Sequence, residues 1–242
     1  MATDPSAERF RRYWTRLELR EKAYDVPAPC ISWRRVPGLN EVEALVWATV
    51  RGASTLLDYG SGDQRLKGKL LEAGYQGRYE TFDLSDEFPT THRQAEDIRG
   101  PFDAVLCLEV IEHLPLEAGL ALRDRLVDLL APGGVLVLST PNPACVVSPF
   151  AEDETHLRLY PLRDLVAWAR GRGLAVEARR VQLLPPRISV GLRMRLLARR
   201  VLCAILGADR ADGLLLICRR PPAGTQARDA ADLGRRGESA YS

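Results

Sequence analysis

Short apolar runs alternate with helical segments along most of the chain, and this alternation limits the fold more than any other feature. The runs that we predict as strands cover 55–59, 78–83, 102–110, 135–140, 174–184 and 213–220. Segments with the 3.6-residue period of a helix separate most of them, at 65–75, 116–130 and 161–173. Strands that alternate with helices build a largely parallel sheet with right-handed crossovers. The prediction is a doubly wound α/β domain.

Two stretches flank this pattern and one interrupts it. Residues 1–52 carry helical spacing, with Asn40 placed to cap a helix, and we predict N-terminal helices that form a lid or wall. The α/β domain is expected at 53–220, with a helical insertion at 185–212 between its last two strands. Residues 221–242 show no periodicity, which predicts a disordered tail.

Composition excludes several classes of protein. A net charge of +2 supplies no global field that would attract nucleic acid or a membrane. Five scattered cysteines without CxxC spacing indicate neither a zinc site nor a disulfide framework. The N-terminus lacks the apolar core of a signal peptide, and no run reaches transmembrane length. We therefore expect a soluble, cytoplasmic protein without a transmembrane segment.

A loop with two glycines, Asp58-Tyr59-Gly60-Ser61-Gly62, follows the first predicted strand. Glycines let the backbone approach a ligand closely, and open α/β sheets bind ligands at the carboxyl edge of their strands. A dinucleotide-binding loop would need a third glycine where Arg65 stands, which argues against NAD. Asp83 closes the second strand about twenty residues further on, where a carboxylate can accept both ribose hydroxyls.

A third motif completes a family pattern. In EDIRGPFDAVLCLEVIEHL (96–114), Asp97 precedes a strand and Glu109 lies at its carboxyl end. Taken together, these motifs resemble the class I S-adenosylmethionine-dependent methyltransferases, and specifically the large family with a D-x-G-x-G loop and an E-V-I-E-H-L signature. The resemblance covers roughly residues 53–180. It implies a Rossmann-like seven-stranded sheet in the order 3-2-1-4-5-7-6, with strand seven antiparallel.

The resemblance also implies S-adenosylmethionine as the cofactor and assigns residues to it. The expected cofactor-binding residues are Asp58, Gly60, Ser61 and Gly62 at the methionine end, Asp83 and Leu84 at the ribose, Asp97 and Ile98 at the adenine, and Leu108 and Glu109. The family often carries another glycine where Gln64 stands, which puts the approach of the following helix in doubt.

Two carboxylates and two imidazoles form the candidate reaction centre: Glu109, Glu112, His113 and His156. This set resembles the ubiquinone-pathway O-methyltransferases and the Hen1-type small-RNA 2′-O-methyltransferases, which place a divalent metal there; Mg²⁺ or Mn²⁺ would suit such ligands. Many members with the same signature are not known to bind metal, and the segment around His156 lacks the Hen1-type sequence. We expect His113 or His156 to act as a general base, and the metal site is the alternative.

The inserted helix, predicted at 188–207, is basic over an apolar face. Its arginines, with the one just before it, are Arg187, Arg193, Arg195, Arg199 and Arg200. Three interpretations stay open: a cap helix with a solvated basic face, a pocket wall that recognises an acidic or phosphorylated acceptor, and peripheral contact with a membrane surface. Aromatic residues for base stacking are absent from it, which argues against nucleic acid as a partner.

The predicted function is O-methylation of a small molecule, with an acidic or phosphorylated acceptor considered. Metal-assisted 2′-O-methylation of RNA is the second hypothesis. A catalytically silent methyltransferase-like scaffold is the third, and a silent domain would have no need of the acidic residues and glycines assigned to the cofactor.

Overall fold

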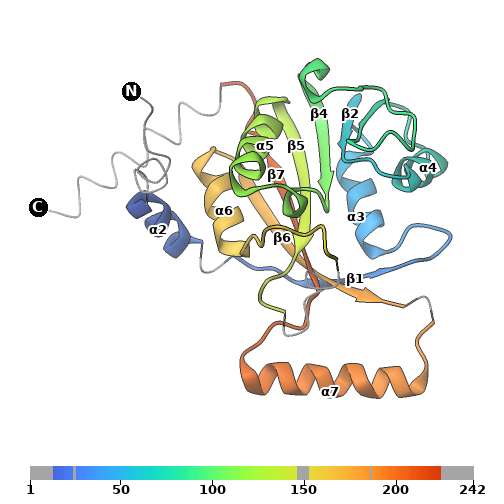
Figure 1. The fold of residues 1–242 in the computed structure, drawn as a ribbon, viewed down its shortest axis with the longest axis vertical. Coiled ribbons are helices and arrows are strands. Elements are labelled where there is room, and N and C mark those ends of the chain that lie inside the picture. Colours follow the sequence, from blue (N-terminus) through green and yellow to red (C-terminus); the bar gives the residue numbers. More distant parts are fainter. Residues whose placement is uncertain (1–12, 24–25, 146–152, 186, 225–242) are drawn as a thin grey trace, which may run out of the picture.

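The computed structural model describes residues 13–23, 26–145, 153–185 and 187–224. Its centre is a seven-stranded sheet in the order β1-β6-β7-β5-β4-β2-β3 (Figure 1). The strands are β1 (Cys30–Arg34), β2 (Thr55–Tyr59), β3 (Arg78–Phe82), β4 (Phe102–Leu108), β5 (Leu130–Pro141), β6 (Ala175–Leu184) and β7 (Gly213–Arg219). Only β7 runs antiparallel to its neighbours, β5 and β6. The predicted fold class is thereby confirmed.

Helices cover both faces of this sheet. The helices are α2 (Tyr13–Lys22), α3 (Glu41–Val50), α4 (Arg65–Glu72), α5 (Leu116–Asp128), α6 (Leu162–Gly171) and α7 (Val190–Leu206), with short 3-10 turns η1 (Ala95–Asp97) and η2 (Ile111–His113). Asn40 caps α3 as predicted, because its side chain accepts from the Glu43 amide while the Glu43 carboxylate accepts from the Asn40 amide, both at 2.9 Å.

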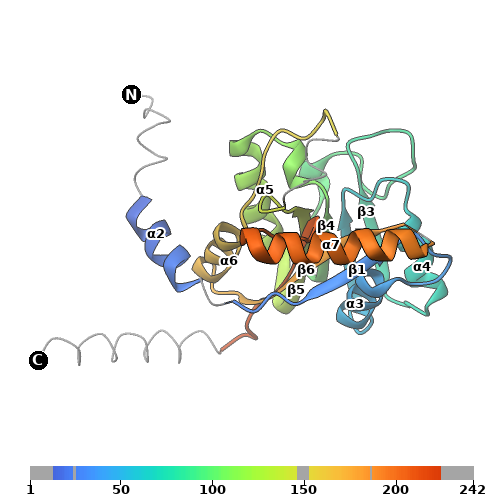
Figure 2. The same cartoon turned by 90° about the horizontal axis from the view of Figure 1, so that it is seen from below.

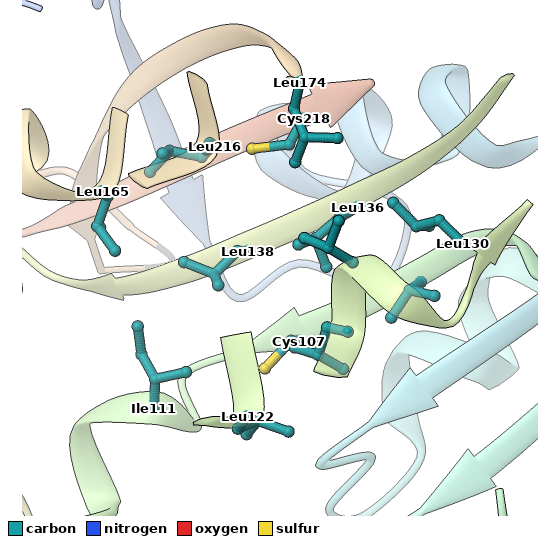
Figure 3. Packing of buried hydrophobic residues seen from close by; sticks show 14 of the residues in the cluster. Cys107, Ile111, Leu122, Leu130, Leu136, Leu138, Leu165, Leu174, Leu216 and Cys218 are labelled. Atoms are coloured by element: carbon teal, nitrogen blue, oxygen red, sulfur yellow. The ribbon is translucent and has the colours of Figure 1, made fainter. Parts of the chain in front are cut away.

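Alternate residues of the central strands feed two separate cores. In β5, Leu136 and Leu138 pack with α5 and α6, while Val135 and Val137 pack with α3 and α4. Figure 3 shows the first of these cores, where Cys107 of β4 lies between Leu122 of α5 and the pair Leu136 and Leu138 of β5. Burial on both faces explains why the sequence of this strand is continuously apolar instead of alternating.

The family order implied a further strand after β3, at that edge of the sheet, but the strand that completes the sheet comes from elsewhere in the sequence. Residues 83–101, all described, contain η1 and a single bridge between Phe82 and His92, but no strand. Instead β1, within the segment 1–52 predicted to be helical, pairs in parallel with β6, with Cys30 opposite Arg180. The prediction of helices in that segment is right for α2 and α3, and it missed the strand between them.

The insertion between β6 and β7 is a helix, as predicted. Ser189 caps α7 by accepting from the Leu192 amide, and Gly207 ends it with a φ of 63°. Figures 1 and 2 show α7 lying across the edge of the sheet at which β4 and β6 end. No helix among the described residues is both long and apolar enough to cross a bilayer. The predicted tail lies outside the described residues from position 225 onward.

Candidate functional site

The loop after β2 is a tight turn held against the end of β3. The amides of Gly60 and Ser61 both donate to the carbonyl of Phe82, at 2.7 and 3.0 Å. Gly60 has a φ of 84°, and a Cβ there would overlap the side chain of Val110. Because only glycine tolerates both the conformation and the close approach, the turn depends on it.

Ser61 and Gly62 give this loop the features of a ligand cradle. The Ser61 hydroxyl is buried, and it has no hydrogen-bond partner in the part of the chain that the structure describes. A Cβ on Gly62 would meet no atom within 4 Å, so there is open space beside the backbone. Gln64 adopts a φ of 56°, the left-handed conformation that the family's glycine would adopt with less strain, and α4 still begins at Arg65. The loop fits the methionine end of the cofactor.

Asp58 is buried at the carboxyl end of β2, with 4% of its surface exposed. This burial raises the pKa of its carboxyl to about 6, while the hydrogen bond that it accepts from the Tyr79 hydroxyl, at 2.8 Å, lowers it. A cationic group bound beside Asp58 would lower this pKa and favour the ionised carboxylate. The amino group of S-adenosylmethionine is such a cation.

Asp83 joins the loop to the end of β3. Its Oδ2 accepts from the Gly62 amide at 2.7 Å, and its Oδ1 accepts from the Ser85 amide at 2.9 Å. Each carboxylate oxygen can accept more than one hydrogen bond, so the carboxylate can still receive ribose hydroxyls. The predicted ribose role stays a prediction, and the structure adds a role in shaping the loop.

The remaining residues assigned to the cofactor have different surroundings. Leu84 is 83% exposed, and Asp97 is exposed in η1. Ile98 is buried in the core, so only its backbone can face a ligand. Leu108 lines the cavity described next. Their contacts with the cofactor stay predictions.

A cavity of roughly 390 Å³ lies at the carboxyl ends of β4 and β5. Its walls come from β1, α3, α4, β6 and β7 as well as those two strands. The lining residues are Trp33, Val42, Glu43, Val46, Leu66, Leu108, Glu109, Ser139, Val181, Leu183, Asp212, Gly213 and Leu215. Concave, mostly apolar spaces of this size with a few polar groups are typical of small-molecule sites.

Glu109 presents the carboxylate at the end of β4 to this cavity. Its Oε1 accepts from the Ser139 hydroxyl at 2.6 Å, and its amide donates to the Ser139 carbonyl at 3.2 Å. Desolvation by the surrounding protein raises the pKa of Glu109, while the hydroxyl of Ser139, the carboxyl of Glu112 and the imidazole of His156 oppose that rise. Glu109 therefore links the cavity to the reaction centre predicted from the sequence.

Glu112, His113 and His156 come together as a compact group. One ligating atom from each lies within 4.8 Å of the others. Glu112 is fully buried, and neither of its carboxylate oxygens has a hydrogen-bond partner among the described residues. Burial, and after it the neighbouring Glu109 carboxylate, raises the pKa of Glu112. The fourth predicted ligand, Glu109, lies beside this group and not within it.

The loop after β5 brings His156 to this group. The Leu157 and Arg158 amides both donate to the Glu112 carbonyl, at 2.7 and 3.0 Å. The ring centres of His113 and His156 are 4.6 Å apart. Nδ1 of His113 lies 2.8 Å from the Thr155 hydroxyl. The geometry thus explains how residues more than forty positions apart in sequence meet.

These donors fit a divalent cation. Ionisation of the buried Glu112 carboxyl, whose two oxygens have no hydrogen-bond partner among the described residues, is unfavourable, and a cation bound there would stabilise the ionised form. Carboxylate oxygens and imidazole nitrogens are suitable ligands for Mg²⁺ and Mn²⁺. Glu112, His113 and His156 would hold such an ion, with Glu109 next to them.

Tyr79, Ser139 and Trp33 are site residues that the sequence analysis missed. Ser139 carried a usable signal, because it is the first polar residue after the apolar run of β5, at the edge where ligands bind. Tyr79 and Trp33 carried none, since their roles depend on how their strands pair.

Comparison with known proteins places the chain in a family. Residues 34–179 match the family model described as methyltransferase domain, which is more than half of the chain. The chain belongs to this methyltransferase family. The methyltransferase is of the class I, S-adenosylmethionine-dependent type predicted from its motifs, and S-adenosylmethionine is the cofactor of that class.

Individual relatives agree with the family. The methyltransferase is 34% identical over 120 residues to a ubiquinone biosynthesis O-methyltransferase of Xanthomonas axonopodis pv. citri (strain 306), covering 44% of this chain and 46% of that protein. The matches span less than half the length of such curated relatives.

Solved structures share the fold of the methyltransferase at low identity. A SAM-dependent methyltransferase from Archaeoglobus fulgidus superposes with a TM-score of 0.54 and 17% identity, covering 74% of this chain and 94% of that one. The 1,6-didemethyltoxoflavin-N1-methyltransferase of Burkholderia thailandensis was solved with S-adenosylhomocysteine. It superposes with a TM-score of 0.50 and 16% identity, covering 89% of this chain and 84% of that one.

Proposed function

We propose that this protein transfers the methyl group of S-adenosylmethionine to a hydroxyl oxygen of a small, neutral and largely apolar acceptor. The observation that carries the proposal is the cavity at the end of β4, which Glu109 lines while it also interacts electrostatically with His156. The relatives named as ubiquinone biosynthesis O-methyltransferases support oxygen as the methylated atom.

The cavity lining favours a neutral acceptor over an acidic or phosphorylated one. Glu43, Glu109 and Asp212 line it, and its described lining residues include no lysine or arginine. An anionic acceptor would meet these carboxylates, and the cations nearest to two of them, Lys69 and Arg199, are already paired with Glu43 and Asp212. Trp33, Val46 and Leu215 supply apolar surface suited to a hydrocarbon or aromatic group.

His156 is the base that we assign to the reaction. Its side chain is 10% exposed, and it interacts electrostatically with Glu109 on one side and with Asp153 on the other, where Nε2 and Oδ2 are 3.9 Å apart. Both carboxylates stabilise the imidazolium that forms when the ring takes a proton. The imidazole of His113 lies beside that of His156, and a hydrogen bond with the Thr155 hydroxyl fixes its position.

Bound S-adenosylmethionine supplies an activated methyl group on a sulfonium centre. The protein aligns the acceptor oxygen with that methyl carbon and removes the hydroxyl proton to His156. The new O–CH₃ bond forms as the S–CH₃ bond breaks, and the electron pair stays on sulfur. Alignment of the two reactants alone can lower the barrier by about 7–11 kcal/mol.

Labelled cofactor tests this proposal. Protein incubated with methyl-labelled S-adenosylmethionine and an organic-solvent extract of cells should transfer label to a product that partitions into the organic phase. Hydriodic acid releases O-methyl groups as volatile methyl iodide, so the label should become volatile. Label that resists this treatment, or that stays with RNA or protein, would contradict the proposal.

A metal-assisted version has one specific observation in its favour, the group of Glu112, His113 and His156. In the RNA hypothesis this ion would assist 2′-O-methylation. Titration with Mn²⁺ followed by EPR tests for the ion, with Glu112→Gln as the variant that loses it. Activity on the organic extract that survives EDTA, together with no Mn²⁺ binding, would exclude the metal-assisted version and leave His156 as the base.

The scaffold hypothesis is tested by calorimetry without any acceptor. A catalytically silent domain should give no heat with S-adenosylmethionine or S-adenosylhomocysteine. Binding of both compounds, with micromolar affinity for S-adenosylhomocysteine, would exclude the scaffold hypothesis.

A further inference from the structure

The outward face of α7 is an exposed apolar surface. Its large apolar residues have between 52% and 76% of their surface exposed: Val190, Met194, Leu197, Val201, Leu202, Ile205 and Leu206. They make up more than half of the exposed large hydrophobic residues in the described part of the chain. Most are spaced three or four positions apart, so they share one broad side of the helix. A continuous patch of this kind marks an interaction surface.

The opposite side of α7 is anchored to the domain. Arg199 donates to Oδ1 of Asp212 at 2.9 Å, and Asp212 is itself buried and accepts from the Leu183 amide at 2.8 Å. Cys203, one turn further along, is also buried. Because these contacts fix the rotation of the helix, its apolar face is held away from the domain.

Three exposed arginines border the apolar face. Arg193 and Arg200 are seven positions apart and follow one border, and Arg195 lies on the other. The helix contains no acidic residue. Two copies packed through this face would therefore bring arginines together without carboxylates on α7 to pair with them. An anionic surface, in contrast, would match this charge.

The helix also lies beside the cavity. The insertion leaves the sheet at the end of β6 and returns at the start of β7, and Leu183, Asp212 and Gly213 at these two junctions line the cavity. Figure 2 shows α7 crossing the edge of the sheet. A surface bound by α7 would therefore lie close to the acceptor site.

We propose that α7 lies in the plane of a membrane that contains anionic lipids. Its apolar face enters the boundary between headgroups and acyl chains, and Arg193, Arg195 and Arg200 contact lipid phosphates. The helix is too short and too charged to span the bilayer, so contact is peripheral. The inference concerns a binding surface and does not depend on the acceptor proposed above, because lipid binding is measured without turnover.

Vesicle sedimentation of the full chain tests the proposal. We expect the protein to pellet with vesicles of phosphatidylcholine and phosphatidylglycerol (3:1) and to remain mostly in the supernatant with phosphatidylcholine alone. Raising the salt concentration should weaken binding. Arg193→Gln and Arg200→Gln should each weaken partitioning about fivefold.

A double variant and a matched control separate the apolar contribution. Val201→Glu with Ile205→Glu should lower partitioning at least tenfold, while Leu71→Glu, at an exposed leucine on α4, should leave it unchanged. Unchanged circular dichroism and S-adenosylhomocysteine binding establish that the double variant is folded. The proposal is overturned if the wild-type chain does not bind anionic vesicles, or if the double variant binds them equally well. If the wild-type chain does not bind vesicles, and light scattering shows that it is a dimer whereas the double variant is a monomer, the apolar face of α7 would instead be assigned to contact with a second copy of the chain.

Discussion

The hydroxyl of Tyr79 donates a hydrogen bond to the buried carboxylate of Asp58 across the strand pair β3 and β2. This bond favours the ionised form of a carboxyl group whose burial raises its pKa to about 6. Asp58 therefore changes its charge close to the physiological range, and the charged form is the one that would bind the cationic end of the cofactor.

Tyr79→Phe should weaken cofactor binding in a pH-dependent way. Loss of the hydrogen bond raises the pKa of Asp58 further, by roughly half a unit to one unit if the bond contributes about 1 kcal/mol. Calorimetric titration with S-adenosylhomocysteine should show the rise of affinity with pH displaced upwards, and the two proteins should converge at pH 8.5. Displacement in the opposite direction would refute the role assigned to Asp58.

Asp58→Asn should change how stability depends on pH. The folded-state pKa of Asp58 lies above its unfolded value of 3.8, so the folded chain holds more protons between about pH 4 and pH 6. Its contribution to stability is therefore greatest below pH 4 and is lost as the pH rises through 6. Relative to the variant, the free energy of unfolding of the wild type should fall by about 2–3 kcal/mol between pH 4 and pH 6, as measured by urea unfolding. Parallel stability curves would be evidence against the shift.

Gly60→Ala should be much more destabilising than Gly62→Ala. A Cβ at Gly60 overlaps Val110 at a φ of 84°, whereas a Cβ at Gly62 meets no atom within 4 Å and adds only backbone strain. We expect the free energy of unfolding to fall by about 3 kcal/mol in Gly60→Ala and by about 1 kcal/mol in Gly62→Ala. Thermal unfolding checks both, and Val110→Ala should partly rescue the first variant. Equal losses, or no rescue, would mean that the contact with Val110 does not limit the turn.

Leu183→Trp should impair acceptor use and leave cofactor binding intact. Leu183 lines the cavity and is 46% exposed, so an indole can extend into the cavity without unfolding the sheet. Leu71→Trp is the matched control, since Leu71 is also 46% exposed and does not line the cavity. We expect KM for the acceptor to rise at least tenfold in the first variant only, while the Kd of S-adenosylhomocysteine stays constant in both. An unchanged KM would place the acceptor elsewhere.

Strands flanked by turns could be predicted closely from sequence. The prediction for 55–59 matches β2 at both ends because a loop with two glycines follows it. β5 begins five residues earlier than the predicted 135, since Leu130 pairs with Phe102 before a shift in register. β1 was missed because five partly exposed residues give no clear period, and the strand depends on a partner far along the chain.

The features of the candidate site also divide into those that local sequence predicted and those that depend on how distant strands pair. The approach of His156 to Glu112 was predicted, because both follow neighbouring parallel strands and meet at one edge. The Tyr79–Asp58 contact and the cavity were not predicted, since the first depends on strand register and the second on the position of β1. Local motifs therefore predicted which side chains come together, while long-range pairing shapes the space around them.

The pairing of β1 with β6 has a consequence for the order of folding. Trp33 and Leu183 face each other in this pair and both line the cavity, yet they lie on opposite sides of the cofactor loop in sequence. During synthesis β1 emerges early and must wait for its partner, because long-range parallel pairs close slowly. The wall of the cavity is therefore completed only after the strands between β1 and β6 have been made. Until then, β1 is an unpaired strand that a chaperone or a neighbouring chain can capture.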